Sequence, residues 1–340
     1  MRTDPGNRPP QRTTKPPRSP KRRAIGFSLR LAVAIGLMVF VLRGVDFGAI
    51  LQTLSQSDIR YLPWMIAIAF FDRYLMAYKW ALLLRARGTM ISNGEAFRIY
   101  IASTFIGTFL PVGLGADIFK LTRTTLSGRR LDTVTASIIM ERVLGLLAVT
   151  VLAIAALSLL MLRQDTQFQQ LFYFMWFLLF GFLALLIVTL KLNSFGPLHR
   201  YVTRLQRYKI ARIMRDIRSE YRELGQNKMV LVRFFILSVL EHGVICFINF
   251  LGGQALGLSV DPVYFFAIIP ISGLLRNMPI SISAIGVQES VYIMLFSLAG
   301  LSAIQSLSFS FFMRMTSLLV VLLGGFIFLY DSIRATKVQS

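Results

Sequence analysis

The sequence is poor in the residues from which disulfides, metal sites and many catalytic centres are built. Its 340 residues include one cysteine, Cys246, and two histidines, His199 and His242. A single cysteine excludes an intramolecular disulfide and a thiolate metal cluster. Cys246 lies in an apolar run, so we assign it to packing, and we expect neither a cofactor nor a metal.

Motifs for nucleotide binding and hydrolysis are absent as well. The chain has no phosphate-binding loop of the Gly-x4-Gly-Lys-Ser/Thr type, no His-Glu-x-x-His and no Gly-x-Ser-x-Gly. The sequence therefore gives no support to ATP-driven pumping by this chain alone, and it favours a non-enzymatic role.

Acidic residues are scarce, with 16 Asp and Glu against 37 Lys and Arg and a net charge of +21. Most of the basic residues lie outside the apolar stretches, and no recognition-helix, zinc-finger or single-strand-binding pattern accompanies them, so we expect no nucleic acid partner. Hydrophobic residues make up 55% of the chain, and the mean hydropathy is +0.63. Several apolar runs approach 20 residues, which indicates a polytopic membrane protein.

We predict an all-α membrane domain over residues 25–330 with about six full crossings and two re-entrant helical hairpins. The crossings are placed near 25–42, 61–84, 134–162, 171–191, 229–257 and 302–330. The preceding segment, 1–24, has six Pro and eight Lys or Arg, and we expect a disordered tail. A cleaved signal peptide is the alternative for the first apolar run, but that run is long and lacks a small-x-small site, so an uncleaved helix is favoured.

The distribution of positive charge predicts the orientation. The tail, the loops 85–95 and 126–133, the linker 198–228 and the C-terminal tail 331–340 hold 23 Lys and Arg, whereas the loops on the opposite side hold three. The positive-inside rule then places both termini in the cytoplasm, with the protein in the cell inner membrane. The region 192–228 reads as a basic amphipathic helix on the inner membrane surface, either an orientation signal or a surface that collects anionic lipid.

The two re-entrant hairpins are predicted where hydrophobic stretches are broken by Pro and Gly. One covers 96–125 around Pro111, and the other covers 262–299 around Pro279. Paired breaks in two halves of a transporter mark its binding site. The units 61–162 and 229–330 repeat the order of charged span, broken segment with an acid, and span with an arginine, so we predict an inverted-topology repeat.

Ionisable residues inside the predicted spans are the candidate functional groups, because each costs roughly 2.5–3.5 kcal/mol to insert and normally faces a cavity or a partner. Two adjacent pairs, Asp72-Arg73 and Glu241-His242, either neutralise one another or brace the helices, and we favour the bracing role. Lys79 is expected to extend toward the cytoplasmic surface.

A phosphate site is predicted where new half-helices begin after the breaks, since unpaired N–H groups and the positive dipole end attract anions. Arginine adds two-pronged contacts to phosphate oxygens. The acids in the first turns, Asp117 and Glu289, have three open roles: capping the half-helices, holding Arg142 and Arg314, or taking up protons. The candidate substrate-binding residues are Gly113, Gly115, Asp117, Lys120, Glu141, Arg142, Arg276, Gly286, Glu289 and Arg314.

The residues from about 30 to 330 resemble the lysylphosphatidylglycerol synthase transmembrane-region family, a flippase-like domain that also occurs as a stand-alone protein. The resemblance rests on Pro111-x-Gly113-x-Gly115-x-Asp117 with Phe119-Lys120, on Glu141-Arg142 with Gly145, and on Gly286-Val-Gln-Glu289. It implies movement of an anionic or modified lipid between leaflets, such as an aminoacylated phospholipid or a polyprenyl-phosphate-linked sugar.

Two departures from the family pattern bear on that expectation. Asp117 stands where Glu is commoner, and Ser283-Ala284-Ile285-Gly286 replaces a Gly-Gly-rich approach to the second acid. The chain ends at Ser340 without a soluble acyl-transfer domain, so we expect no synthase activity. The alternatives are a membrane-embedded glycosyl or phosphoryl transferase and a non-transporting scaffold for partner enzymes of envelope-lipid biosynthesis. The oligomeric state is left open.

Overall fold

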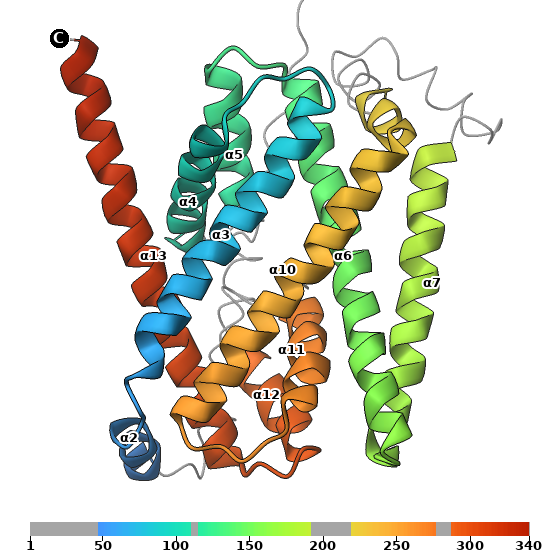
Figure 1. Ribbon diagram of the computed structural model, residues 1–340, viewed down its shortest axis with the longest axis vertical. Coiled ribbons are helices and arrows are strands. Elements are labelled where there is room, and N and C mark those ends of the chain that lie inside the picture. Colours follow the sequence, from blue (N-terminus) through green and yellow to red (C-terminus); the bar gives the residue numbers. More distant parts are fainter. Residues whose placement is uncertain (1–46, 110–114, 192–218, 277–286, 340) are drawn as a thin grey trace, which may run out of the picture.

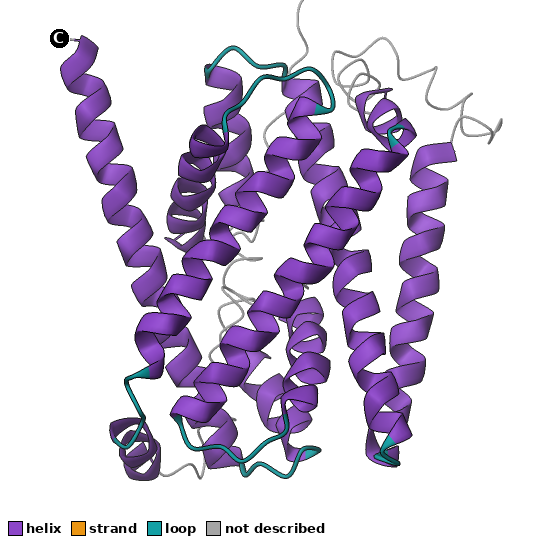
Figure 2. Ribbon diagram, viewed as in Figure 1, coloured by secondary structure: helices purple, strands orange, loops and turns teal. Residues whose placement is uncertain are grey.

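The computed structural model describes residues 47–109, 115–191, 219–276 and 287–339. Within these ranges the chain forms helices joined by turns, and it forms no strand (Figure 2). The all-α prediction is therefore confirmed. The predicted tail 1–24, the predicted first span 25–42 and most of the predicted amphipathic linker lie outside the described residues.

Five long helices make up most of the bundle (Figure 1). They are α3 (Tyr61–Arg85), α6 (Leu131–Leu162), α7 (Gln169–Lys191), α10 (Lys228–Ala255) and α13 (Ala303–Gln339). Helix α13 thus continues beyond residue 330, where we placed the end of the last span. A short helix, α2 (Phe47–Ser55), precedes α3, and the turn η1 (Thr166–Phe168) precedes α7.

In the described part of the chain, four helical segments are long and apolar enough to cross a membrane, at 131–162, 166–184, 228–255 and 303–326. The protein is therefore a membrane protein of several apolar helices. Helix α3 has 25 residues, but Asp72 and Arg73 lower its hydropathy. The count of six crossings stays a prediction.

Each broken segment forms two short helices. The first gives α4 (Asn93–Phe109) and α5 (Gly115–Leu126), and the second gives α11 (Pro262–Arg276) and α12 (Val287–Ser297). The interruptions, with Pro111 and Pro279, lie outside the described residues. Within each pair the two helices pack against each other. Figure 1 shows α4 and α5 at one end of the bundle and α11 and α12 at the opposite end.

The arms of the first pair approach each other closely because one contact residue is glycine. A Cβ on Gly107 of α4 would lie 2.9 Å from the Cβ of Ala116 on α5. Since real Cβ atoms do not approach so closely, a larger residue at 107 would push the arms apart beside Asp117. Gly324 allows α13 a similar approach to α4, where a Cβ would lie 2.8 Å from Ile101 Cγ2.

Helices α3 and α10 begin the two predicted units, and they run side by side through the middle of the bundle (Figure 1). Helix α3 also packs against α4, α6 and α13, and α10 packs against α6, α11 and α13. This central pair therefore contacts helices from both predicted units.

The described end of the linker differs from the prediction of a helix lying on the membrane surface. Residues 219–226 are helical, but Tyr221 and Leu224 are buried against the bundle in a cluster that includes Phe234. Glu220 accepts a hydrogen bond from Arg87 at 2.8 Å, and its other carboxylate oxygen lies 3.1 Å from Arg130. The apolar face of this segment is covered by protein, and its acid anchors it to two neighbouring turns.

At the opposite end of the bundle, an ion pair and a hydrogen bond join the turn after α6 to the start of α11. Arg163 donates to Asp261 at 2.9 Å, and the Tyr264 hydroxyl donates to Asp165 at 2.9 Å. The backbone N–H of Val263 and the Arg163 guanidinium lower the pKa of the Asp261 carboxyl. Arg163 and Asp261 themselves lie outside the two helix pairs, in the turn after α6 and in the turn before α11.

Candidate functional site

The first acid of the predicted site pairs with the arginine that follows it. Asp117 lies in the first turn of α5, and the Nε of Arg142 on α6 donates to Asp117 Oδ2 at 2.7 Å. A second guanidinium nitrogen contacts the same oxygen. The side chain of Arg142 is 50% exposed, whereas that of Asp117 is 17% exposed. Asp117 therefore holds Arg142 and also stabilises the positive end of the α5 dipole.

A buried lysine stands behind this pair. Lys120 Nζ lies 3.2 Å from Asp117 Oδ1 and donates to Glu141 Oε2 at 2.9 Å. The other Glu141 oxygen accepts a hydrogen bond of 2.9 Å from the Tyr100 hydroxyl. Nζ also lies 4.7 Å from the Tyr100 ring centroid and 5.6 Å from that of Trp80. Two carboxylates and two aromatic rings thus stabilise the Lys120 charge.

The second acid and its arginine form the corresponding pair in the other half. Glu289 lies in the first turn of α12, and Arg314 on α13 donates to Glu289 Oε1 at 2.7 Å. The sequence separation is 25 residues in both pairs. Here the acid side chain is only 1% exposed and the arginine 26%. The structure thus repeats one contact between a half-helix and the next long helix.

Aromatic side chains pack between the helices of the second pair and α13. Phe265 of α11, Tyr292 and Phe296 of α12 and Phe309 of α13 pack together, with Phe296 and Phe309 ring centroids 5.3 Å apart and Phe265 and Phe296 centroids 5.4 Å apart. Such contacts stabilise beyond their buried area. They fix α12 against α11 and α13, and so position Glu289 against Arg314.

The remaining predicted site residues fall at the breaks. Gly115 is buried at the first position of α5. Gly113 and Gly286 lie outside the described residues, and Arg276 is the last residue of α11, with its side chain outside the described part. In the described ranges, no group of three or more His, Cys, Asp and Glu is placed to hold a metal ion.

A further charged cluster, which the sequence predicted only in part, joins α3 to α10. Lys79 Nζ donates to Glu241 Oε2 at 2.9 Å and to Ser238 Oγ at 3.1 Å, and it lies 5.2 Å from the Phe234 ring centroid. His242 Nδ1 lies 2.8 Å from Glu241 Oε2. The expectation that Lys79 extends to the membrane surface is wrong, because its side chain is 4% exposed and meets a buried acid on the facing helix.

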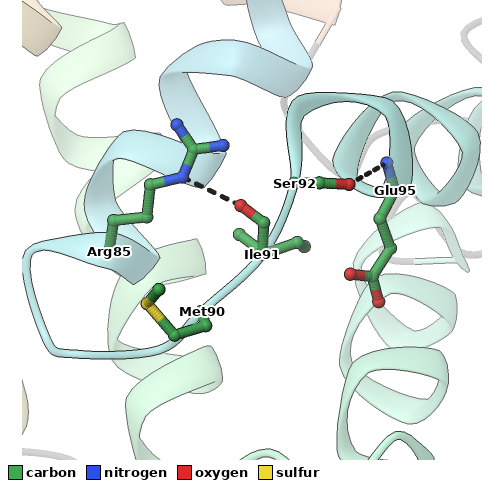
Figure 3. A pocket seen from close by; sticks show the side chains of 5 residues that line it. All are labelled: Arg85, Met90, Ile91, Ser92 and Glu95. Atoms are coloured by element: carbon green, nitrogen blue, oxygen red, sulfur yellow. Dashed lines mark hydrogen bonds between the residues drawn. The ribbon is translucent and has the colours of Figure 1, made fainter.

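A separate pocket of about 340 Å³ lies at the turn between α3 and α4 (Figure 3). It is lined by Arg85, Met90, Ile91, Ser92 and Glu95. Arg85 Nε donates to the Ile91 carbonyl at 2.9 Å, and Ser92 Oγ accepts from the Glu95 N–H at 3.1 Å. This pocket is at the start of α4, the end away from the break, so it is distinct from the acid–arginine pairs.

Sequence reasoning did not predict Trp80 and Tyr100 as partners of Lys120. Aromatic residues make up 12% of the chain, so an aromatic residue in a span is no signal of a cation nearby. Tyr100 lies on α4 and Trp80 on α3, and only the packing of α4 against α5 and of α3 against α4 brings the rings to Lys120.

The fold and these clusters define an integral membrane protein with ionisable side chains held among apolar helices. The family model for the lysylphosphatidylglycerol synthase TM region matches residues 27–325, and the chain belongs to this family. The match includes both helix pairs and both acid–arginine contacts. A search of curated proteins gave no match.

Proposed function

We propose that the protein moves a lipid with a phosphate or other anionic headgroup between the two leaflets of the membrane. The observation that carries this proposal is the repeated acid–arginine contact, with a separation of 25 residues in each half. An arginine held by a carboxylate in apolar surroundings is a site where another anion can exchange for the carboxylate, because guanidinium binds carboxylate and phosphate with the same two-pronged geometry.

In this proposal Arg142 and Arg314 bind the headgroup while the acyl or prenyl chains stay in lipid. Asp117 and Glu289 hold the arginines when no headgroup is bound. Lys120 and Glu141 keep Asp117 in place, since the ammonium lies 3.2 Å from one acid and 2.9 Å from the other.

The residues at the breaks complete the proposed site. We include Gly113, Gly115 and Gly286 in the proposed site, because a glycine in general lets backbone N–H groups come close to a bound anion. Arg276, at the end of α11, adds a cation near the second break.

Transport between leaflets needs access from both sides, which the positions of the helix pairs support. Figure 1 has α4 and α5 at one end of the bundle and α11 and α12 at the other. We propose that both pairs are re-entrant hairpins of an inverted-topology repeat. Arg85 ends α3, and Arg87, Arg129 and Arg130 lie in the turns beside α4 and α5, so we place that end in the cytoplasm and the protein in the inner membrane.

Substitution of the two arginines tests this function. Arg142→Ala and Arg314→Ala should each abolish transfer of fluorescent phosphatidylglycerol, lysyl-phosphatidylglycerol or a polyprenyl phosphate between the leaflets of proteoliposomes. Arg163→Ala is the matched control, because Arg163 also forms an ion pair with an aspartate but lies outside both helix pairs. The amount of folded protein is measured for each variant by size-exclusion chromatography. Transfer at the wild-type rate in both site variants contradicts the proposal.

A further inference from the structure

Asp72 is a buried carboxylate, and one of its two oxygens accepts no hydrogen bond from the described residues. Its side chain is 1% exposed, and Oδ2 lies 3.0 Å from the guanidinium of the adjacent Arg73. The other oxygen, Oδ1, is buried and has no hydrogen-bond partner among the residues that the structure describes. A buried acceptor without a partner is costly, and most such groups in proteins are satisfied. The exception calls for an explanation in terms of what Oδ1 binds.

The charged neighbours of Asp72 come from two helices. Arg73 and Lys79 lie on α3, and Glu241 and His242 lie on the facing helix α10. With His242 neutral, the two acids balance the two permanent cations. The cluster therefore has no excess negative charge to bind a metal cation. It can accept one proton, which raises its net charge by one.

Asp72 differs from Glu241 in what protonation would disrupt. Glu241 Oε2 accepts a hydrogen bond from Lys79 at 2.9 Å and meets His242 Nδ1 at 2.8 Å, so a proton there would weaken both contacts. A proton on Asp72 Oδ1 displaces no hydrogen bond among the described residues and weakens one ion pair, that of Oδ2 with Arg73, while it removes a charge from a buried position. Of the two acids, Asp72 is the better proton acceptor by its contacts alone.

We propose that Asp72 binds and releases a proton, and that this proton regulates the transport assigned to the protein above. The carboxylate takes up one proton from the aqueous phase at Oδ1 and becomes a neutral acid, which leaves Arg73 without its counter-charge. Release of the proton restores the pair. The regulatory part of this inference rests on the proposed function, whereas proton binding does not.

Helix packing and polar contacts form a line from Asp72 to the first arginine. Helix α3, which carries Asp72 and Arg73, packs against α4, and the Tyr100 hydroxyl on α4 donates to Glu141 at 2.9 Å. Glu141 accepts from Lys120, which in turn meets Asp117, the partner of Arg142. Protonation of Asp72 changes the charge balance at one end of this line. We expect this change in charge to alter the affinity of Arg142 for a headgroup relative to its affinity for Asp117.

The position of Asp72 between the two helices also suits a regulatory role. Helix α3 packs against α4 of the first unit and against α13, which carries Arg314. Helix α10 packs against α6, which carries Arg142, and against α11 of the second unit. A change in the charge between α3 and α10 therefore acts on a contact shared by both halves.

Infrared spectroscopy of the purified protein in liposomes tests proton binding without any transport. As the pH is lowered, the wild-type protein should gain the carbonyl stretching band of a protonated buried carboxyl. Asp72→Asn should lose this band, and Glu241→Gln should keep it. Asp261→Asn, which alters an exposed carboxylate, is the control for surface acids. Absence of the band from the wild type, its persistence in Asp72→Asn, or its loss in Glu241→Gln overturns the assignment.

Transport measurements then test the coupling separately. If wild-type lipid transfer varies with pH, Asp72→Asn should still transfer lipid and should lose that variation, while His242→Gln should retain it. Transfer that is independent of pH in the wild type, or pH-dependent in Asp72→Asn, overturns the coupling and leaves the transport proposal standing. If the infrared band behaves as expected but no lipid is moved, the proposed function fails and Asp72 remains a proton site.

Discussion

The two acid–arginine pairs share a sequence spacing but differ in what surrounds them. The first pair, Asp117 and Arg142, belongs to a chain of charged and hydroxyl groups, and its arginine is half exposed. The second pair, Glu289 and Arg314, is more deeply buried beside an aromatic cluster. Equivalent contacts in the two units therefore lie in different surroundings, and we expect them to contribute unequally to the stability of the protein.

This inequality has a structural cause in the helix pairs themselves. Helix α5 is polar, and its buried residues are Gly115, Lys120 and Thr124, so charge and close backbone packing hold it in place. Helix α12 buries Tyr292, Leu295 and Phe296 and is held by apolar packing. An anion therefore reaches Arg142 more easily than Arg314, and we expect the first half to be the more open one in this conformation.

Of the substitutions in the two acid–arginine pairs, Glu289→Ala is expected to lower the stability of the protein most. Glu289→Ala leaves the partly buried Arg314 without this carboxylate, and breaking a buried ion pair costs about 3–5 kcal/mol. The variant should therefore unfold at a clearly lower denaturant concentration in detergent micelles. The double variant Glu289→Ala with Arg314→Met should recover much of the loss, because the uncompensated charge is gone. A single variant as stable as the wild type would show that burial does not distinguish the second pair.

An intermediate effect is expected at Lys120, the buried cation of the first half. Lys120→Met preserves length and apolar packing but removes the ammonium from Glu141 and Asp117. Each acid keeps another partner, Tyr100 or Arg142, so we expect a loss of about 2 kcal/mol rather than that of a fully broken pair. Lys120→Arg controls for the charge. A loss larger than that of Glu289→Ala would reverse the proposed order of the two halves.

The sequence predicted the local order of the helices well because each signal is local. Pro111 and Pro279 mark breaks in apolar runs, and the described helices end before these residues and resume after them. The positions of Asp117 and Glu289 in first turns follow from the same breaks, since an acid just after a glycine-containing break falls at a helix start. The similar spacing to Arg142 and Arg314 also pointed to corresponding arginines in the two units.

Contacts between helices that are distant in the chain could not be predicted from the sequence. Lys79 was expected at the membrane surface because it lies toward the end of its span, but Glu241, 162 residues away, draws it into the bundle. Glu220 was read as part of a surface helix, and its contact with Arg87 depends on how the linker meets the turn after α3. Periodicity places a side chain on its own helix and says nothing of which other helix it faces.

The smallest effect is expected at Asp117, and it tests the comparison most directly. Asp117→Asn keeps the shape of the side chain and removes the charge opposite Arg142, which is 50% exposed. It also removes the charge opposite Lys120, but that ammonium keeps its contact with Glu141. Exposed pairs contribute about 0–1 kcal/mol, so the free energy of unfolding should change by no more than this. Because water already reaches Arg142, added salt should reduce the difference between variant and wild type further, whereas the cost of Glu289→Ala should persist. Equal salt sensitivity of the two variants would mean that both arginines lie in the same environment. It would contradict the inference that Arg142 is more accessible to water and anions than Arg314.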